Sequence, residues 1–166
     1  MKKIELLNKV PKDKDKFFFI GVSGSRSWNN FKEFDSILSA VYLAVREAFM
    51  LDKENIAIVS GGAKGVDSMA ERWASEIKLP MYVINADWKN IGRAAGPIRN
   101  TKIVDTSDVI VAFPKSSSSG TWDTIKKAEK KNIPIMGAII NNDSENLDKE
   151  KVFNNWKKFV DSISPS

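Results

Sequence analysis

Cysteine and histidine are both absent from this chain of 166 residues. Without thiols, the protein cannot form disulfides, thiolate nucleophiles or thiolate metal sites. Without imidazole, it cannot build a Ser-His-Asp or Cys-His catalytic arrangement or a His-ligated zinc site. We therefore expect no metal site and no cofactor, although a Mg²⁺ ion that accompanies a ligand phosphate is compatible with these absences. Any catalysis has to use carboxylates, Lys, Arg, hydroxyl groups or the backbone.

The chain also has no long apolar run. None approaches the roughly 20 residues that span a bilayer, and charges interrupt the N-terminal sequence Met1–Leu7, where a signal peptide needs a continuous apolar core. Hydrophobic residues make up 42% and charged residues 28%, an ordinary balance for a water-soluble domain. Together with the missing cysteine, this composition predicts a cytoplasmic protein that is not inserted in a membrane.

The net charge of +5 comes from a modest excess of Lys and Arg. Much of this excess lies in residues 2–16 and 126–131. Such runs are typical of solvated faces, whereas nucleic-acid surfaces more often combine concentrated Lys and Arg with exposed aromatic rings. The charge pattern therefore disfavours nucleic acid as a partner.

The length predicts one folded domain. The sequence divides into three segments, of which the central one forms this domain. Residues 1–16 form a lysine-rich lead that we expect to be at most partly ordered against the body. Residues 17–140 form the domain itself. Residues 141–166 form a polar linker and an amphipathic helix, whose apolar residues from Phe153 to Ile163 recur at helical spacing.

Apolar runs and helical patterns alternate through the central segment. The expected strands are Phe17–Val22, Ile56–Val59, Met81–Ile84, Asp108–Phe113 and Ile133–Met136. Helical patterns begin at Phe31 with Asn29 or Asn30 as the N-cap, cover Met69–Ile77, follow a longer loop at 85–97, and surround Ile125. This alternation predicts an α/β fold: a single Rossmann-like domain with a mostly parallel five-stranded sheet, helices on both faces and a C-terminal helix. Trp73 and Trp156 fall on apolar helical faces and are expected in the core.

Three turns rich in glycine and hydroxyl groups each follow an expected strand and precede an expected helix. They are Gly21–Arg26, Ser60–Gly65 and Ser116–Thr121. Backbone N–H groups and helix N-termini at one sheet edge bind phosphate, and Arg26, Lys64 and Arg99 lie close to or between the turns. The alternative is that glycine merely lets each turn reverse direction. Three such turns together favour a nucleotide-like ligand, held where the turns after the first and fourth expected strands meet.

Two common nucleotide motifs are excluded. The turn after Val59 lacks the Gly-Lys-Ser/Thr ending of a Walker A loop, and therefore has no hydroxyl for Mg²⁺. Gly21 and Gly24 are three residues apart, where the dinucleotide fingerprint requires two, and no third glycine follows. An ATPase and an NAD dehydrogenase are both disfavoured.

An ordered set of motifs nevertheless resembles the YspA/YpsA-related branch of the SLOG superfamily. The matching segments are Gly24–Trp28, Val59–Asp67, Ala70–Ala74, Ala86–Trp88, Ala94–Asn100, Phe113–Pro114 and Gly120–Thr121. The resemblance covers about residues 17–137. It implies a Rossmann-like domain that binds nucleotides or nucleotide-derived ligands, with the LOG phosphoribohydrolases and the DprA proteins as relatives.

The resemblance to LOG enzymes also implies two catalytic positions. Arg99 occupies the arginine-like position in Pro97–Asn100. Thr124, however, stands where the LOG pattern Gly-Thr-x-x-Glu places its catalytic glutamate, and Asp123 is the preceding residue. If the protein is an enzyme, Arg99 and Asp123 are the expected catalytic residues. We expect Asp123 in the first turn of its helix, where the helix dipole stabilises the anion and makes the carboxyl a poor general acid.

Individual site residues have expected roles that compete with structural ones. Arg99 can form bidentate bonds to a phosphate or ribose, or a surface salt bridge. Asp67 is expected to order the glycine loop, and Asp123 to clasp a ribose or bond to backbone. Asp87 and Trp88 can hold a base or ribose, although Trp88 can equally cap the core. The expected ligand-binding residues are Gly24, Ser25, Arg26, Gly61, Gly62, Lys64, Gly65, Asp67, Asp87, Trp88, Arg99, Asn100, Ser119, Gly120, Thr121 and Asp123.

We therefore predict a protein that senses or sequesters a small phosphorylated nucleotide or nucleotide-derived ligand, and that forms a homo-oligomer. The first alternative is a nucleoside-monophosphate phosphoribohydrolase or another N-glycosidase acting in the same pocket. The second is DprA-like binding of single-stranded nucleic acid.

Overall fold

The computed structural model describes residues 4–7, 17–115 and 117–137. These residues form one six-stranded sheet with strand order β1-β4-β3-β2-β5-β6, and every pairing is parallel. The strands are β1 Ile4–Leu7, β2 Phe18–Gly24, β3 Ile56–Ser60, β4 Met81–Ile84, β5 Val109–Phe113 and β6 Ile135–Gly137. The helices are α1 Phe31–Phe49, η2 Lys53–Asn55, α2 Val66–Ile77, α3 Trp88–Ile91, η3 Gly92–Ala94, α4 Ala95–Thr106 and α5 Ser119–Lys130. The predicted Rossmann-like α/β fold is confirmed.

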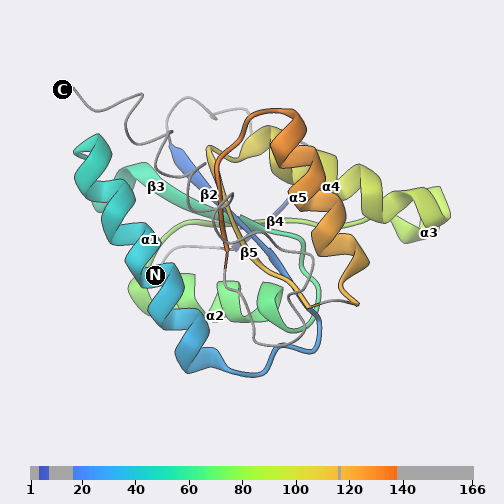
Figure 1. The fold of residues 1–166 in the computed structure, drawn as a ribbon, viewed down its shortest axis with the longest axis horizontal. Coiled ribbons are helices and arrows are strands. Elements are labelled where there is room, and N and C mark those ends of the chain that lie inside the picture. Colours follow the sequence, from blue (N-terminus) through green and yellow to red (C-terminus); the bar gives the residue numbers. More distant parts are fainter. Residues whose placement is uncertain (1–3, 8–16, 116, 138–166) are drawn as a thin grey trace.

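Helices cover both faces of the sheet, as Figure 1 shows. The buried faces of α1 and α2 form one core cluster with Ile20, Val22 and Ile58, and that cluster includes Trp73, as predicted. The buried faces of α4 and α5 form a second cluster with Phe19 and Val59. Successive residues of the central strands point to opposite faces, so a strand buried on both sides has to be apolar throughout. This requirement explains the continuous apolar runs in the sequence.

The sheet contains one strand more than the sequence analysis predicted. Ile4–Leu7 forms β1 and pairs in parallel with β4, with Ile4 opposite Met81 and Leu7 opposite Ile84. The sequence analysis had placed this segment in the lysine-rich lead, because four apolar or charged residues give too short a pattern to identify a strand. Pairing with an existing strand edge supplies the stability that the short segment lacks by itself.

The first glycine turn was predicted too early. Gly21 is a residue of β2, where it pairs with Val59 on one side and Ile110 on the other. A Cβ atom at Gly21 would lie 2.2 Å from Ser107 Oγ, so the glycine allows close packing of α4 on the sheet. The chain leaves the sheet only after Gly24. The turn at the carboxyl end of β2 therefore begins at Ser25.

The segment 85–97 is also more ordered than the predicted loop. It contains α3 and η3, and α4 begins at Ala95. α1 begins as predicted, because the Asn30 side chain accepts a hydrogen bond from the Glu33 N–H. The predicted linker and C-terminal helix at 141–166, including Trp156, lie outside the described residues. None of the helices that the structure describes is long and apolar enough to cross a membrane.

Gly65 joins β3 to α2 at a position that no other residue can occupy without strain. Its φ is 72° and its ψ is −122°, and a Cβ atom there would lie 2.4 Å from the Ser25 carbonyl oxygen. Gly92 has a similar backbone conformation, with φ 78° and ψ −140°, but its Cβ position has no neighbour within 4 Å. A comparison of alanine substitutions at Gly65 and Gly92 therefore distinguishes the cost of backbone strain from the cost of steric overlap.

We expect Gly65→Ala to lower the free energy of unfolding by at least about 1 kcal/mol more than Gly92→Ala does. Both variants carry the backbone penalty, and only Gly65→Ala adds the clash with the Ser25 turn. Urea denaturation of both variants measures the difference. Equal losses would show that the α2 start can move away from that turn.

Candidate functional site

A cavity of about 690 Å³ opens at the carboxyl ends of β2 and β5. β3 and β4 lie on one side of β2, while β5 and β6 lie on the other, so the chain reverses its direction across the sheet between β2 and β5. Ligands bind at this kind of switch point in open α/β sheets. The cavity is lined by Ser23, Gly24, Ser25, Arg26, Ser27, Ala63, Asp67, Trp88, Gly96, Pro97, Arg99, Asn100, Ile103, Ser117, Ser118, Ser119, Gly120, Thr121 and Asp123.

The Ser25 turn forms one wall of this cavity. The Ser25 N–H donates to the Phe113 carbonyl, while the Ser25 carbonyl accepts from the N–H groups of Val66 and Trp28. The Ser27 N–H donates to Ser25 Oγ. Lys115 reaches the turn from the end of β5 and donates through Nζ to Ser27 Oγ. These bonds hold the ends of β2 and β5 and the start of α2 in one fixed arrangement.

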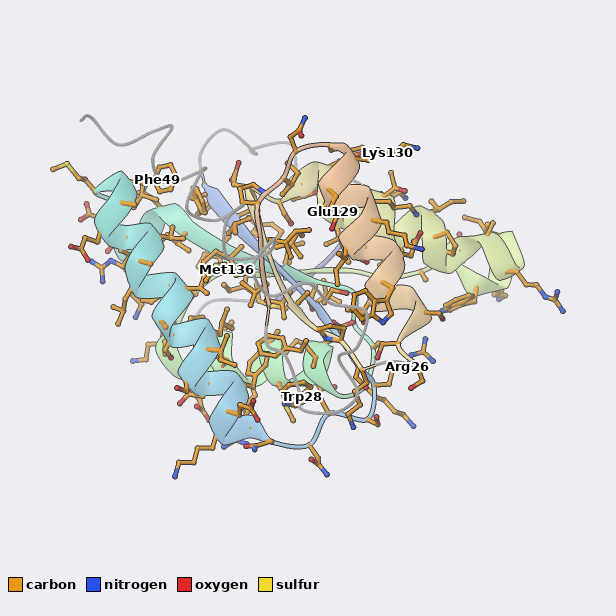
Figure 2. All side chains as sticks on the ribbon, in the orientation of Figure 1. Arg26, Trp28, Phe49, Glu129, Lys130 and Met136 are labelled. Carbon is orange, nitrogen blue, oxygen red and sulfur yellow. The ribbon has the colours of Figure 1, made fainter. Side chains whose placement is uncertain are left out.

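Arg26 and Arg99 both line the cavity. Arg26 follows the Ser25 turn, and Figure 2 places it near the end of α5 that lies opposite Lys130. Arg99 projects from α4, and its NH1 group donates to the Gly61 carbonyl at 2.5 Å. Burial lowers the pKa of Arg99, nearby Asp67 opposes that shift, and Arg26 adds to it. Neither arginine forms an ion pair within the described residues.

Asp67 lies beneath the glycine turn that precedes α2. Its carboxylate accepts a hydrogen bond from the Ala63 N–H at 3.1 Å, which matches its predicted role in ordering that turn. The side chain is buried, and burial raises the pKa of Asp67 from 3.8 to about 6, against the lowering effects of the Ala63 bond and of Arg99. The Asp67 carboxylate therefore compensates part of the charge of Arg99 at the same cavity.

Asp123 lies in the second turn of α5, as the fifth residue of the helix. The prediction of a first-turn position was therefore wrong, because α5 begins already at Ser119. Asp123 Oδ2 accepts hydrogen bonds from Asn100 Nδ2 at 3.0 Å and from Lys127 Nζ at 2.8 Å. The neighbouring Thr124 is fully buried, and its hydroxyl donates to the Gly120 carbonyl. The carboxylate at 123, and not the side chain at 124, faces the cavity.

The helix N-termini fall into two groups, with and without a hydrogen bond from the N-cap side chain. α1 and α3 are capped by the side chains of Asn30 and Asp87. α2, α4 and α5 have no hydrogen bond from a side chain at their N-caps, which are Gly65, Ala94 and Ser118. The positive ends of these helix dipoles favour anions.

The structure brings most of the predicted site residues together. Eleven of them line the cavity: Gly24, Ser25, Arg26, Asp67, Trp88, Arg99, Asn100, Ser119, Gly120, Thr121 and Asp123. Gly61, Gly62, Lys64, Gly65 and Asp87 lie outside the lining. Gly61 lies under Arg99, Gly62 packs against Asn85, and Gly65 packs against the Ser25 turn, while Asp87 caps α3. Lys64 is exposed.

The sequence analysis missed several residues that line or support the site. The cavity lining also includes Ser23, Ser27, Ala63, Gly96, Pro97, Ile103, Ser117 and Ser118. Most of these residues lie within turns or motifs that the sequence analysis had identified, so their neighbours in the sequence already indicated the site. Lys127 had a weaker signal, namely its spacing of four residues from Asp123. Within the described residues, no group of three carboxylate side chains is placed to hold a metal ion.

Comparison with known proteins agrees with this fold. Residues 20–90 match the family described as "YspA, cpYpsA-related SLOG family". The chain is 31% identical over 121 residues to the Gene 61 protein of Mycobacterium phage D29, and the match covers 69% of this chain and 91% of the phage protein. The chain therefore belongs to the YspA, cpYpsA-related SLOG family.

Two solved DprA structures share the fold. The DNA processing protein A of Streptococcus pneumoniae superposes with a TM-score of 0.62 at 16% identity, over 94% of this chain and 60% of that one. The DNA processing protein A of Helicobacter pylori, which binds single-stranded DNA, superposes with a TM-score of 0.54 at 18% identity. The match covers 93% of this chain and 84% of that one. The chain thus spans less than two thirds of the S. pneumoniae protein. At these identities the similarity shows the fold alone.

Asp67 makes stability depend on pH in an unusual direction. Because its pKa is higher in the folded protein than in the unfolded chain, the folded state binds more protons between about pH 4 and pH 6. Stability conferred by the protonated carboxyl is therefore lost as pH rises through this window. The Asp67→Asn variant keeps a side-chain oxygen that can accept the hydrogen bond from the Ala63 N–H. It cannot ionise, so it removes this loss of stability with rising pH.

We expect the stability of Asp67→Asn relative to the unsubstituted protein to increase by roughly 2.5 kcal/mol from pH 4 to pH 7. Denaturant titrations across that range, without added ligand, measure the difference. Parallel curves for the two proteins would mean that Asp67 ionises in the fold as it does in water.

Proposed function

We propose that this protein binds a small phosphorylated nucleotide or nucleotide-derived ligand, which it senses or sequesters, in the cavity at the carboxyl ends of β2 and β5. The pair of arginines carries the proposal. Arg26 and Arg99 line one cavity and repel each other, and neither has a carboxylate within ion-pairing distance in the described part of the chain. A phosphate between them would relieve this repulsion and accept charge-assisted hydrogen bonds.

The surroundings of the arginines support a phosphate group. Ser25, Ser27 and the serines at the start of α5 supply hydroxyl groups to the same cavity. The α5 N-terminus lacks a side-chain cap, so its dipole is available to an anion. These features reinforce the charge of Arg26 on the same wall.

Trp88 supports recognition of a base. It lines the cavity with 52% of its surface exposed, and its indole lies against Gly96 at the start of α4. A Cβ atom at Gly96 would approach the ring to 2.9 Å, so glycine is the residue that permits this position. An exposed indole face offers a stacking surface of the kind that nucleobases use. The cavity volume of about 690 Å³ is within the range for small-molecule sites.

We expect Arg99→Ala to weaken the binding of a nucleoside monophosphate about ten- to a hundredfold, because it removes a charge-assisted contact. Isothermal calorimetry with AMP, GMP, CMP and UMP measures the change. Arg93→Ala is the matched control, since Arg93 is exposed on η3 and does not line the cavity. Arg26→Ala is a second test, because Arg99 also supports Gly61. Unchanged affinity in both cavity variants would exclude the phosphate site.

An enzyme of the same cavity is the first alternative, because the Asp123 carboxylate faces it. Cleavage of an N-glycosidic bond needs a carboxylate beside the developing cation and a proton for the leaving base. Asp123 Oδ2 already accepts two hydrogen bonds, from Asn100 Nδ2 and from Lys127 Nζ. This arrangement suits binding better than proton donation.

We therefore expect slow or no release of free base when the protein is incubated with the same four nucleoside monophosphates. Chromatography of the mixtures over time measures it, with Asp123→Asn as the control. Rapid release that disappears in Asp123→Asn would identify the protein as an N-glycosidase.

Binding of single-stranded nucleic acid is the second alternative, favoured by the fold shared with the H. pylori DprA protein. Such binding depends on counterion release, so its affinity falls steeply with salt. A fluorescent thymidine oligonucleotide titrated at several salt concentrations distinguishes the two ligand classes. Tight binding at physiological salt that Arg99→Ala abolishes would assign the cavity to nucleic acid.

A further inference from the structure

Asp123 poses an electrostatic problem for the proposed phosphate site. It places a carboxylate in the same cavity as Arg26 and Arg99, with 36% of its side chain exposed. A bare carboxylate there would repel a phosphate and cancel part of the arginine field. The contacts around Asp123 show how this conflict is resolved.

Lys127 neutralises the Asp123 carboxylate from a position outside the cavity lining. It lies one helical turn after Asp123 on α5, and its Nζ is 2.8 Å from Asp123 Oδ2. The same ammonium group donates to the Pro97 carbonyl in α4 at 2.7 Å. Lys127 itself does not line the cavity. It is therefore anchored to both helices while its charge is directed at one carboxylate oxygen.

The two donors to Asp123 meet at a single oxygen. Asn100 Nδ2 and Lys127 Nζ both bind Oδ2, and Asn100 is in turn fixed by a bond from its Nδ2 to the Gly120 carbonyl. No donor to Oδ1 is found in the part of the chain that the structure describes. An ionised carboxylate oxygen can only accept hydrogen bonds, so its natural partner is a hydroxyl or amine donor. The donors on Oδ2 leave Oδ1 available for such a group.

We infer that Lys127 is a positioning residue, which holds Asp123 as a neutralised acceptor for a sugar hydroxyl of the ligand. This inference rests on the proposed nucleotide site and adds to it a preference for ribose over deoxyribose. Lys127 offsets the repulsion between Asp123 and the phosphate, and together with Asn100 it fixes the orientation of the carboxylate. A 2′-deoxy ligand loses the hydroxyl and leaves Oδ1 without a partner.

The test compares AMP, GMP, CMP and UMP with their 2′-deoxy counterparts by calorimetry. We expect the protein to bind the ribonucleotides about tenfold more tightly or better, which is the effect of one hydrogen bond to a charged group. In Lys127→Met the ratio should fall to about one or two, and Lys127→Arg should restore part of it. Lys126→Met is the matched control, because it removes the same charge from an exposed position on the same helix.

A merely structural role for Lys127 would weaken ribo- and deoxyribonucleotide binding equally. A ratio that stays unchanged in Lys127→Met, or that is absent in the unsubstituted protein, therefore overturns the inference. If Arg99 controls affinity while the ratio is absent, the phosphate site survives and the hydroxyl acceptor does not.

A second measurement needs no ligand. By nuclear magnetic resonance, the Asn100 side-chain amide hydrogens should exchange with solvent faster in Lys127→Met than in Lys126→Met, since Asp123 is no longer held in place. Equal exchange rates would show that Lys127 does not position Asp123. If no nucleoside monophosphate binds to the unsubstituted protein, the proposed function and the hydroxyl acceptor both fail, and this rate still decides the positioning role.

Discussion

The backbone of Ser25 is the point on which the site depends. Its N–H binds the end of β5, and its carbonyl receives the first N–H of α2 as well as that of Trp28. One peptide thus connects the strand before the switch point, the strand after it and the helix that follows β3. The close approach requires Gly24 and Gly65, because a Cβ atom at either would overlap Val66 or the Ser25 turn. The cavity wall can be rigid because its backbone groups are already satisfied within the protein.

The charges of the site are balanced in two places. Asp67 lies buried beneath Arg99, and Lys127 lies behind Asp123. Asp67 thus offsets part of the charge of Arg99, and Lys127 offsets that of Asp123, which limits the desolvation cost of holding these charges at the cavity. Arg26 and Arg99 nevertheless form no ion pair in the described part of the chain, and both line the cavity. In the proposed function, an anionic ligand completes this balance.

The sequence predicted those features that depend on local patterns. Continuous apolar runs identified the central strands, and Asn30 marked the start of α1, because burial on both faces and N-terminal capping leave signatures a few residues long. Short segments were harder. Ile4–Leu7 became a strand only by pairing with β4, and Gly21 belonged to a strand although it resembled a turn residue. In both cases a neighbour distant in sequence decides the conformation, so no local pattern could reveal it.

The sequence by itself predicted the Rossmann-like fold, the family and the edge of the sheet proposed for the ligand, because alternating β and α elements with right-handed connections give a parallel sheet whose strands all end at one edge. It also identified Arg26, Arg99, Asn100 and Asp123 as residues that line the cavity. Only the tertiary structure decided which groups face one another across it. That Arg99 rests on Gly61, that Trp88 lies on Gly96, and that Lys127 joins Asp123 to Pro97 depends on the packing of α4 against α5 and against the glycine turn. Such contacts are set by side-chain geometry across the fold, and sequence spacing along one element does not encode them.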